Sequence, residues 1–277
     1  MKTLSRCLLI LSVLVSLGCV VSATAQSKPA ANVIGPENVS FPSGTETVHG
    51  VLYRPQGAGP FPAIVVIHEW WGLNDYAQRR ARELAALGYP ALAIDMYGNG
   101  QTADNPKDAG HLMHTVVGDT ERQYARSLAG LELLKAQPQV DARRVAAIGY
   151  CFGGKMVLDM ARRNMELAGV VSFHGALATA TRAEKGKIKA SVLVLNGDAD
   201  GFIPPADIDA LKTEMKTAGA NFTFVNYPGA KHGFTSTDAD KLAKEHGMDI
   251  AYNPAADADS WKRMQAFLQR IFHSSNH

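Results

Sequence analysis

Cysteine is scarce in this chain of 277 residues, which contains only three. Cys7 and Cys19 lie in an apolar segment near the amino terminus, so the remainder of the chain keeps Cys151 alone. A lone cysteine cannot form an internal disulfide, and in an oxidising compartment it is a liability unless it is buried or used. Because 46% of the residues are apolar, the chain can instead bury a sizeable hydrophobic core.

An excess of one charge is also missing. The chain has 28 Lys and Arg residues against 26 Asp and Glu, and loss of a leader containing Lys2 and Arg6 would leave 26 of each. The basic doublets are scattered at Arg79-Arg80, Arg143-Arg144 and Arg162-Arg163. Nucleic-acid binding needs a clustered basic face, whereas scattered doublets are typical of solvated helix surfaces. Nucleic acid is therefore not an expected partner.

Signatures of nucleotide and metal chemistry are missing or incomplete. No Gly-Lys-Ser/Thr phosphate motif occurs, and the glycines of residues 98–103 only imitate a dinucleotide loop, because Asn105-Pro106 should interrupt the helix that would receive the phosphates. His111 and His114 are spaced to share a metal, but the sequence offers no third ligand and a catalytic zinc needs three. We therefore expect neither a cofactor nor a metal site.

The longest apolar run lies at the amino terminus. A basic start, the apolar run and a set of small residues follow one another at Lys2 and Arg6, residues 7–21, and Ala23-Thr24-Ala25. The run contains Ser and Gly and falls short of the ~20 apolar residues of a membrane span, so a membrane anchor is the weaker alternative. A lipoprotein anchor at Cys19 is weaker still, because Ser16 stands where a large aliphatic residue is usual. The pattern predicts a signal peptide over residues 1–25, export to the periplasm, and no stable membrane insertion after cleavage.

The rest of the chain reads as one domain. We predict an extended arm over residues 26–42 and a single domain over residues 43–277, with no repeat or linker to divide it. Short apolar runs occur at 63–68, 89–95, 145–148, 170–173, 192–195 and 222–227, and helical patterns at 75–87, 119–136, 154–165, 205–218 and 258–272. Alternation of buried strands with helices predicts an α/β fold, a mostly parallel sheet with helices on both faces. The oligomeric state is not specified by these patterns.

The strongest local signal is Gly149-Tyr150-Cys151-Phe152-Gly153-Gly154, directly between an expected strand and an expected helix. A sharp strand-to-helix turn strains the central residue and leaves no room for side chains on its neighbours, which explains the glycines. The turn also places the thiol near a helix amino terminus, where a thiolate is favoured. Cys151 is therefore the candidate nucleophile, and a buried structural cysteine is the alternative.

A nucleophile needs a base, and the base needs a group that orients it. The strand at 192–195 leads into a loop with Asp198 and Asp200, and the strand at 222–227 leads to His232 between two glycines. We assign Asp200 as the acid, because Asp198 lies closer to the strand end and more naturally shapes the turn. The chain order nucleophile, acid, histidine is that of the α/β-hydrolase fold.

The loop after the strand at 63–67 supplies further candidates. In that fold this loop provides one backbone N–H of the oxyanion hole, and the residue after the nucleophile provides the other, which assigns Trp70 and Phe152. Glu69 is then held near the thiol, where an apolar wall of Trp70 and Trp71 would raise its pKa and make it a proton acceptor. Packing is the alternative role for the tryptophans, and a salt bridge with an arginine is the alternative for Glu69.

These residues resemble the dienelactone hydrolase family of cysteine hydrolases over roughly residues 47–272. The residues that carry the resemblance are Val66-Ile67-His68-Glu69-Trp70-Trp71-Gly72, Asp95-Met96-Tyr97-Gly98, Gly149-Tyr150-Cys151-Phe152-Gly153-Gly154, the Asp200 loop and Gly229-Ala230-Lys231-His232-Gly233. The resemblance implies a thiol that rests protonated beside Glu69 and ionises when substrate displaces that contact. It also implies an acyl-enzyme that water cleaves with help from His232.

One departure concerns the substrate. Family members that act on the dienelactone hold its carboxylate with arginines, one of them four residues after the catalytic histidine, where this chain has Ser236. Arg122 or Arg126 is a possible replacement, and a neutral ester or lactone is at least as good a candidate as an anionic one. By residue type, the expected substrate-binding residues are Trp71, Tyr97 and Tyr150. His174 is expected there because it follows the strand at 170–173, with a satisfied core histidine as the alternative.

The sequence thus predicts an exported, cofactor-independent hydrolase of small-molecule esters or lactones, with the triad Cys151, Asp200 and His232. A peptidase or acyltransferase on the same scaffold is the first rival, because fold does not fix function. A non-catalytic ligand-binding protein that keeps the pocket is the second.

Overall fold

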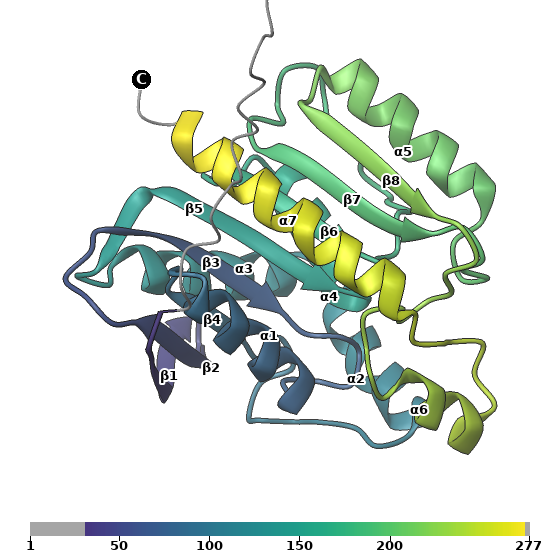
Figure 1. Ribbon diagram of the computed structural model, residues 1–277, viewed down its shortest axis with the longest axis horizontal. Helices are drawn as coiled ribbons and strands as arrows, with labels where there is room; N and C mark the ends of the chain where they lie inside the picture. The colour runs from purple at the N-terminus through teal and green to yellow at the C-terminus, as the bar shows by residue number, and fades with distance from the viewer. Residues whose placement is uncertain (1–30, 275–277) are drawn as a thin grey trace, which may run out of the picture.

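The computed structural model describes residues 31–274, and the predicted signal peptide lies outside them. One eight-stranded sheet organises these residues, in the order β1-β2-β4-β3-β5-β6-β7-β8 (Figure 1). Strands β3 to β8 are parallel to one another, and β2 pairs antiparallel with both β1 and β4. The prediction of a single α/β domain with a mostly parallel sheet is confirmed. Within the described range, no helix is both long and apolar enough to cross a membrane.

The strands are β1 (Val33–Ser43), β2 (Glu46–Pro55), β3 (Phe61–Ile67), β4 (Ala91–Ile94), β5 (Val140–Tyr150), β6 (Gly169–Phe173), β7 (Ser191–Gly197) and β8 (Phe222–Tyr227). The helices are α1 (Asp75–Ala86), α2 (Pro106–Val117), α3 (Thr120–Lys135), α4 (Phe152–Arg162), α5 (Pro205–Ala218), α6 (Ala239–His246) and α7 (Pro254–Ser274).

Two hydrophobic cores lie on opposite faces of the sheet, because successive strand residues point to opposite sides. Along β3, Ile64 and Val66 belong to the core covered by α1 and α7, which crosses the front of the sheet in Figure 1. Val65 and Ile67 belong to the other core, which α3, α4 and α5 cover. Burial on both faces explains why the strands read as continuous apolar runs rather than as alternating patterns.

The amino-terminal boundary differs from the prediction. From Val33 onward, the segment predicted as an extended arm forms β1, which pairs with β2 at the edge of the sheet. Most of β1 is exposed, so the strand carries little apolar pattern, although Phe41 is buried in the core. Backbone pairing therefore places this strand in the sheet without a clear signal in its side chains.

Two helices were absent from the prediction, α2 and α6. Asn105-Pro106 begins α2 rather than merely interrupting a helix: the Asn105 side chain accepts a hydrogen bond from the Asp108 N–H at 3.0 Å. Pro is tolerated in the first helical turn because the N–H that it lacks has no partner there. Both helices become important at the pocket described below.

The topology brings four loops to one edge of the sheet. The loops after β3, β5, β7 and β8 all leave the carboxyl ends of parallel strands, so they emerge at the same edge. Open α/β sheets bind ligands at this edge. These four loops carry Glu69, Cys151, Asp200 and His232 respectively.

Candidate active site

Cys151 occupies a strained turn between β5 and α4. Its backbone has φ 53° and ψ −115°, in the region of positive φ that non-glycine residues rarely adopt. A Cβ on Gly149 would lie 1.9 Å from the Gly153 carbonyl oxygen, and one on Gly153 would lie 2.2 Å from the Ile67 carbonyl oxygen. A Cβ on Gly154 would come within 2.7 Å of the Gly175 Cα. The glycines are therefore required by close backbone approach, as the sequence predicts.

His232 and Asp200 are joined directly. His232 Nδ1 lies 2.8 Å from Asp200 Oδ2, and Asp200 also accepts a hydrogen bond from the Phe202 N–H at 2.9 Å. The other candidate acid, Asp198, is exposed and accepts from the Gly229 N–H at 2.5 Å, so it fixes the turn after β8. The structure thus places Asp200 on the histidine and leaves Asp198 in the turn.

The imidazole of His232 also interacts with Cys151. Burial alone would disfavour an imidazolium, but the Cys151 sulfur and the hydrogen-bonded Asp200 carboxylate hold the pKa of His232 well above its ordinary value of 6.5. A histidine with a raised pKa can hold a proton at neutral pH and donate it to another group.

Two backbone N–H groups are available beside the sulfur. Across residues 31–274, neither the Trp70 nor the Phe152 N–H has a hydrogen-bond acceptor. The loop that carries Trp70 is held by His68, whose Nε2 accepts from the Met96 N–H at 3.1 Å while its Nδ1 donates to the Glu69 carbonyl at 2.5 Å. Free N–H groups on a fixed loop and at a helix start are suited to bind a developing oxyanion.

Glu69 is buried at the same place. Burial raises the pKa of Glu69 from 4.5 to about 7, although the nearby charges of His232 and Arg80 act in the opposite direction. In the described part of the chain no ion pair joins Glu69 to an arginine, so the salt-bridge alternative does not match the structure. A carboxyl group with a pKa near neutrality can exchange a proton with its surroundings at physiological pH.

Cys151, His232 and Glu69 line one pocket of about 220 Å³. The complete lining comprises Glu69, Trp70, Trp71, Met113, Val117, Cys151, Phe152, Lys155, Ala176, Phe202, Ile203, His232, Gly233, Ser236, Ala239, Leu242, Met248 and Ile250. Predicted residues Trp70, Trp71 and Phe152 are among them. Most of the wall is apolar, as in pockets that take small organic ligands.

Three of the predicted substrate-binding residues do not line this pocket. Tyr97 lies under the loop, where its hydroxyl donates to the Trp70 carbonyl at 2.9 Å. Tyr150 is fully buried on the α1 and α7 side of the sheet, because as the last residue of β5 it points away from the face that Cys151 serves. His174 is also fully buried and bonds Thr235 rather than facing the cavity.

Part of the pocket wall comes from elements that the sequence did not reveal. Met113 and Val117 belong to α2, Ala239 and Leu242 belong to α6, and Met248 and Ile250 follow α6. The apolar residues of α2 recur at helical spacing, at Ala109, Leu112, Met113, Val116 and Val117. By contrast, α6 is only eight residues long and contains few apolar residues. The helical spacing in α2 is a signal that could have revealed this helix from the sequence, whereas the short α6 offers no comparable pattern.

No lysine or arginine in the pocket lining is free to bind a substrate carboxylate. Arg126 bonds Glu46 at 2.8 Å and the Met96 carbonyl at 2.5 Å, and Arg122 lies 3.5 Å from Glu46, so neither reaches the pocket. Lys155 does line the pocket, but its ammonium is ion-paired with Asp159. Ser236 stands on the wall as a neutral residue.

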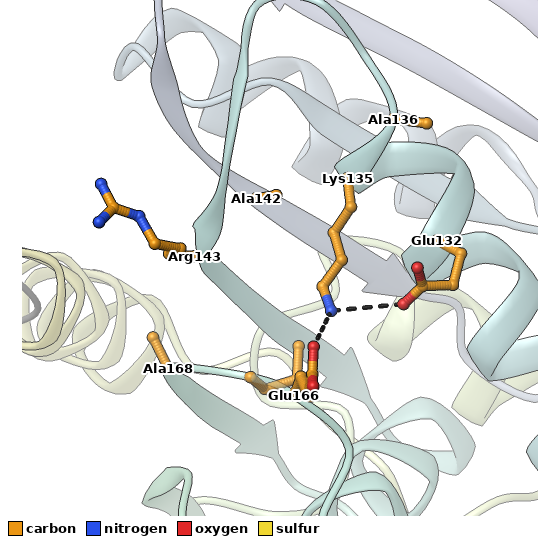
Figure 2. Close-up of a pocket in the computed structure, with 8 residues that line it drawn as sticks. Glu132, Lys135, Ala136, Ala142, Arg143, Glu166 and Ala168 are labelled. Carbon is orange, nitrogen blue, oxygen red and sulfur yellow. Dashed lines mark hydrogen bonds and ion pairs between the residues drawn. The ribbon is translucent and has the colours of Figure 1, made fainter.

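A larger hollow of about 600 Å³ lies at the opposite edge of the sheet (Figure 2). Its wall comes from the end of α3, the start of β5 and the residues before β6, including Lys135, Glu132 and Glu166. The Lys135 ammonium is 3.3 Å from Glu132 and 3.0 Å from Glu166, so these charges satisfy one another. The residues that line this hollow include no cysteine, serine or histidine. The smaller pocket is therefore the candidate active site.

Stability should depend on pH through Glu69. Because its pKa is about 7 in the folded chain and 4.5 ordinarily, the folded state holds a proton that the unfolded state has lost between these values. The contribution of protonated Glu69 to the stability of the folded chain is complete below pH 4.5 and is lost as the pH rises through 7. The parent chain should therefore lose about 3 kcal/mol of unfolding free energy, relative to Glu69→Gln, as the pH rises from 4.5 to 8. Urea unfolding of both chains over this pH range measures the difference. Parallel pH curves for the two chains would contradict this.

Comparison with known proteins agrees with the geometry. Residues 48–272 match the model of the dienelactone hydrolase family. A Methylorubrum extorquens protein named "Putative carboxymethylenebutenolidase" is 29% identical, over 87% of this chain and 82% of its own. The solved structure "m3DLH" is 37% identical with TM-score 0.81, over 88% of this chain and 99% of its own. A dienelactone hydrolase-like promiscuous phosphotriesterase from metagenomic libraries is 33% identical with TM-score 0.79, over 87% and 99%. The chain therefore belongs to the dienelactone hydrolase family and is a hydrolase with the α/β-hydrolase fold.

Proposed function

We propose that this hydrolase cleaves esters or lactones through an acyl-enzyme on Cys151. The observation that carries the proposal is the convergence of Cys151 and the His232–Asp200 pair on one pocket, beside two N–H groups without acceptors. These parts supply the nucleophile, the acid–base group and the oxyanion site that acyl transfer needs.

The first half-reaction follows from this arrangement. The Cys151 sulfur attacks the carbonyl carbon, a C–S bond forms, and an electron pair moves to the carbonyl oxygen, which accepts hydrogen bonds from Trp70 and Phe152 N–H. The pair then returns, the C–O bond to the alcohol breaks, and the alcohol oxygen takes a proton from the His232 imidazolium. His232 can serve as this acid because its pKa is raised.

The second half-reaction returns the thiol. Water gives a proton to the neutral His232 and attacks the thioester carbon, and the C–S bond breaks to release the acid and the thiolate. Asp200 keeps the imidazole oriented in both steps through its bond to Nδ1. In this proposal Glu69 accepts the thiol proton before attack and returns it to the thiolate after the acid leaves, a role supported by its burial at the pocket and its pKa of about 7.

The favoured substrate is neutral. The pocket has an apolar wall, a serine at position 236 and a lysine already paired with Asp159, so no free lysine or arginine can compensate a carboxylate on the substrate. Ionised Glu69 would repel such a carboxylate as well. We therefore infer a small uncharged ester or lactone with an apolar acyl or alcohol part, rather than the anionic dienelactone.

Loss of the triad should abolish turnover of a neutral chromogenic ester. We expect Cys151→Ala and Asp200→Asn to lower kcat/KM by about 10³-fold or more, while the matched control Asp198→Asn stays close to the parent enzyme. Intact mass during turnover should show a transient acyl adduct on the parent chain.

Full activity of Cys151→Ala would exclude the thiol mechanism. No turnover of any ester, with Cys151 inert to alkylation, would favour a binding protein, and preferred cleavage of peptides would favour the peptidase rival.

Two esters that differ only in charge at the far end of the acyl chain should be cleaved with different kcat/KM. A 4-nitrophenyl ester ending in a methyl ester should be cleaved with kcat/KM at least about tenfold higher than one ending in a free carboxylate, because an unpaired charge is costly in the apolar pocket. Asp159→Asn should narrow the ratio by releasing the Lys155 ammonium. Equal or better cleavage of the anionic ester by the parent enzyme would exclude a neutral substrate class.

We also propose that the hydrolase is exported. The support is the basic start, the apolar run of residues 7–21 and the small residues up to Ala25. Expression of the full chain in a Gram-negative host should yield periplasmic protein whose intact mass corresponds to a chain that begins at Gln26. Ala25→Trp should block the cleavage after residue 25. Full-length protein confined to the cytosol would contradict export.

A further inference from the structure

A buried line of polar side chains lies behind His232 and takes no part in the mechanism above. His174 Nε2 is 2.7 Å from the Thr235 hydroxyl, which is 2.6 Å from the Tyr76 hydroxyl, and Arg80 Nε donates to that hydroxyl at 3.4 Å. All four residues are buried. Buried polar groups are costly unless they are hydrogen-bonded, so such a line needs a reason.

The direction of the hydrogen bonds follows from what each group can give. Arg80 only donates, so the Tyr76 oxygen accepts from it and the Tyr76 proton has Thr235 as its acceptor. The Thr235 proton is then donated to His174 Nε2. This leaves His174 neutral with its proton on Nδ1, an atom without a partner in residues 31–274.

His174 contacts the ring of His232 directly. The two ring centroids are 5.2 Å apart with an interplanar angle of 67°, and Phe202 contacts His232 at the same separation. Phe202 is half exposed, whereas His174 is fully buried, so His174 is the fixed neighbour. Its backbone has φ 38°, a left-handed conformation that bulky residues adopt only where the surroundings impose it.

The neighbours of His174 also keep it uncharged. Burial lowers the pKa of His174 well below its ordinary value, and the charges of His232 and Arg80 lower it further. The titratable groups that face it are His232, Arg80 and Tyr76, with the Tyr150 ring at 6.2 Å. A second positive charge this close to His232 would oppose the imidazolium that protonates the leaving group.

We propose that His174 is a positioning residue for His232, a neutral imidazole oriented by Thr235, Tyr76 and Arg80 that fixes the catalytic ring and leaves it free to carry the charge. This inference rests on the proposed role of His232. The line connects α1, on one face of the sheet, with the loop that carries the catalytic histidine.

The matched variants are Thr235→Val, which removes the donor to His174, and Thr235→Ser, which keeps it. Without the donor, Nε2 can take a proton, so the pKa of His174 rises. The positive charge on His174 then lowers the pKa of His232, which loses its imidazolium form. We expect Thr235→Val to lower kcat about tenfold with little change in KM and to move the alkaline limb of the kcat profile downward by about one pH unit, because the pKa of the His232 acid falls. Thr235→Ser should stay close to the parent enzyme. Parent-like kcat and pH profile in folded Thr235→Val would overturn the proposal.

A second measurement does not depend on turnover. Nitrogen NMR of the histidine-labelled chain at pH 7 should show His174 neutral, with Nδ1 protonated and Nε2 without a proton. It should also show a lowered pKa of His232 in Thr235→Val or, if that variant fails to fold, in Thr235→Ala, which removes the same donor. A charged His174, or one protonated on Nε2, would overturn the inference. An ester-inactive parent enzyme with the expected spectrum would count against the proposed function and leave the inference on His174 intact.

Discussion

The close approach of backbone around Cys151 is the constraint on which the rest of the site depends. A Cβ at Gly149 or Gly153 would enter the backbone of its neighbours, so β5, the turn and α4 can meet only where side chains are missing. This contact holds the sulfur at the carboxyl edge of the sheet and at the start of a helix. The side chains of Glu69, Asp200 and His232 reach this point on the loops that follow β3, β7 and β8.

Burial then decides what each group can do. Glu69 and His174 are both buried, yet one carries a raised pKa and the other a lowered one, because burial disfavours the charged form of either group. His232 escapes that outcome since Asp200 and the Cys151 sulfur stabilise its charged form. One pocket thus holds an acid that can be neutral beside a base that can be charged, which is what proton transfer at neutral pH needs.

Much of this arrangement could be predicted from sequence, and the failures have physical causes. The buried parallel strands have continuous apolar runs, and the Gly-rich turn permits few conformations, so the sheet and the place of Cys151, Asp200 and His232 follow from short patterns. Edge strand β1 depends on backbone pairing and α6 has only eight residues, so neither carries a strong pattern. The apolar residues of α2 do recur at helical spacing, but the prediction treats Asn105-Pro106 as a break in a helix rather than as a helix start. Tyr150 and His174 were assigned to the pocket by residue type, but the direction of a side chain at a strand end depends on the register of the sheet.

The pocket has two kinds of wall: a cover formed by residues of α2 and α6, and the turn that carries Cys151. Met113 and Val117 on α2 and Leu242 on α6 belong to segments outside the sheet, whereas the turn at Cys151 is held by close backbone contacts among β5, β3 and α4. Exchanges in the cover leave the backbone contacts of the turn untouched. A lineage could therefore change which molecules enter while retaining the same reacting atoms, and divergence in substrate range should accumulate in these two short helices.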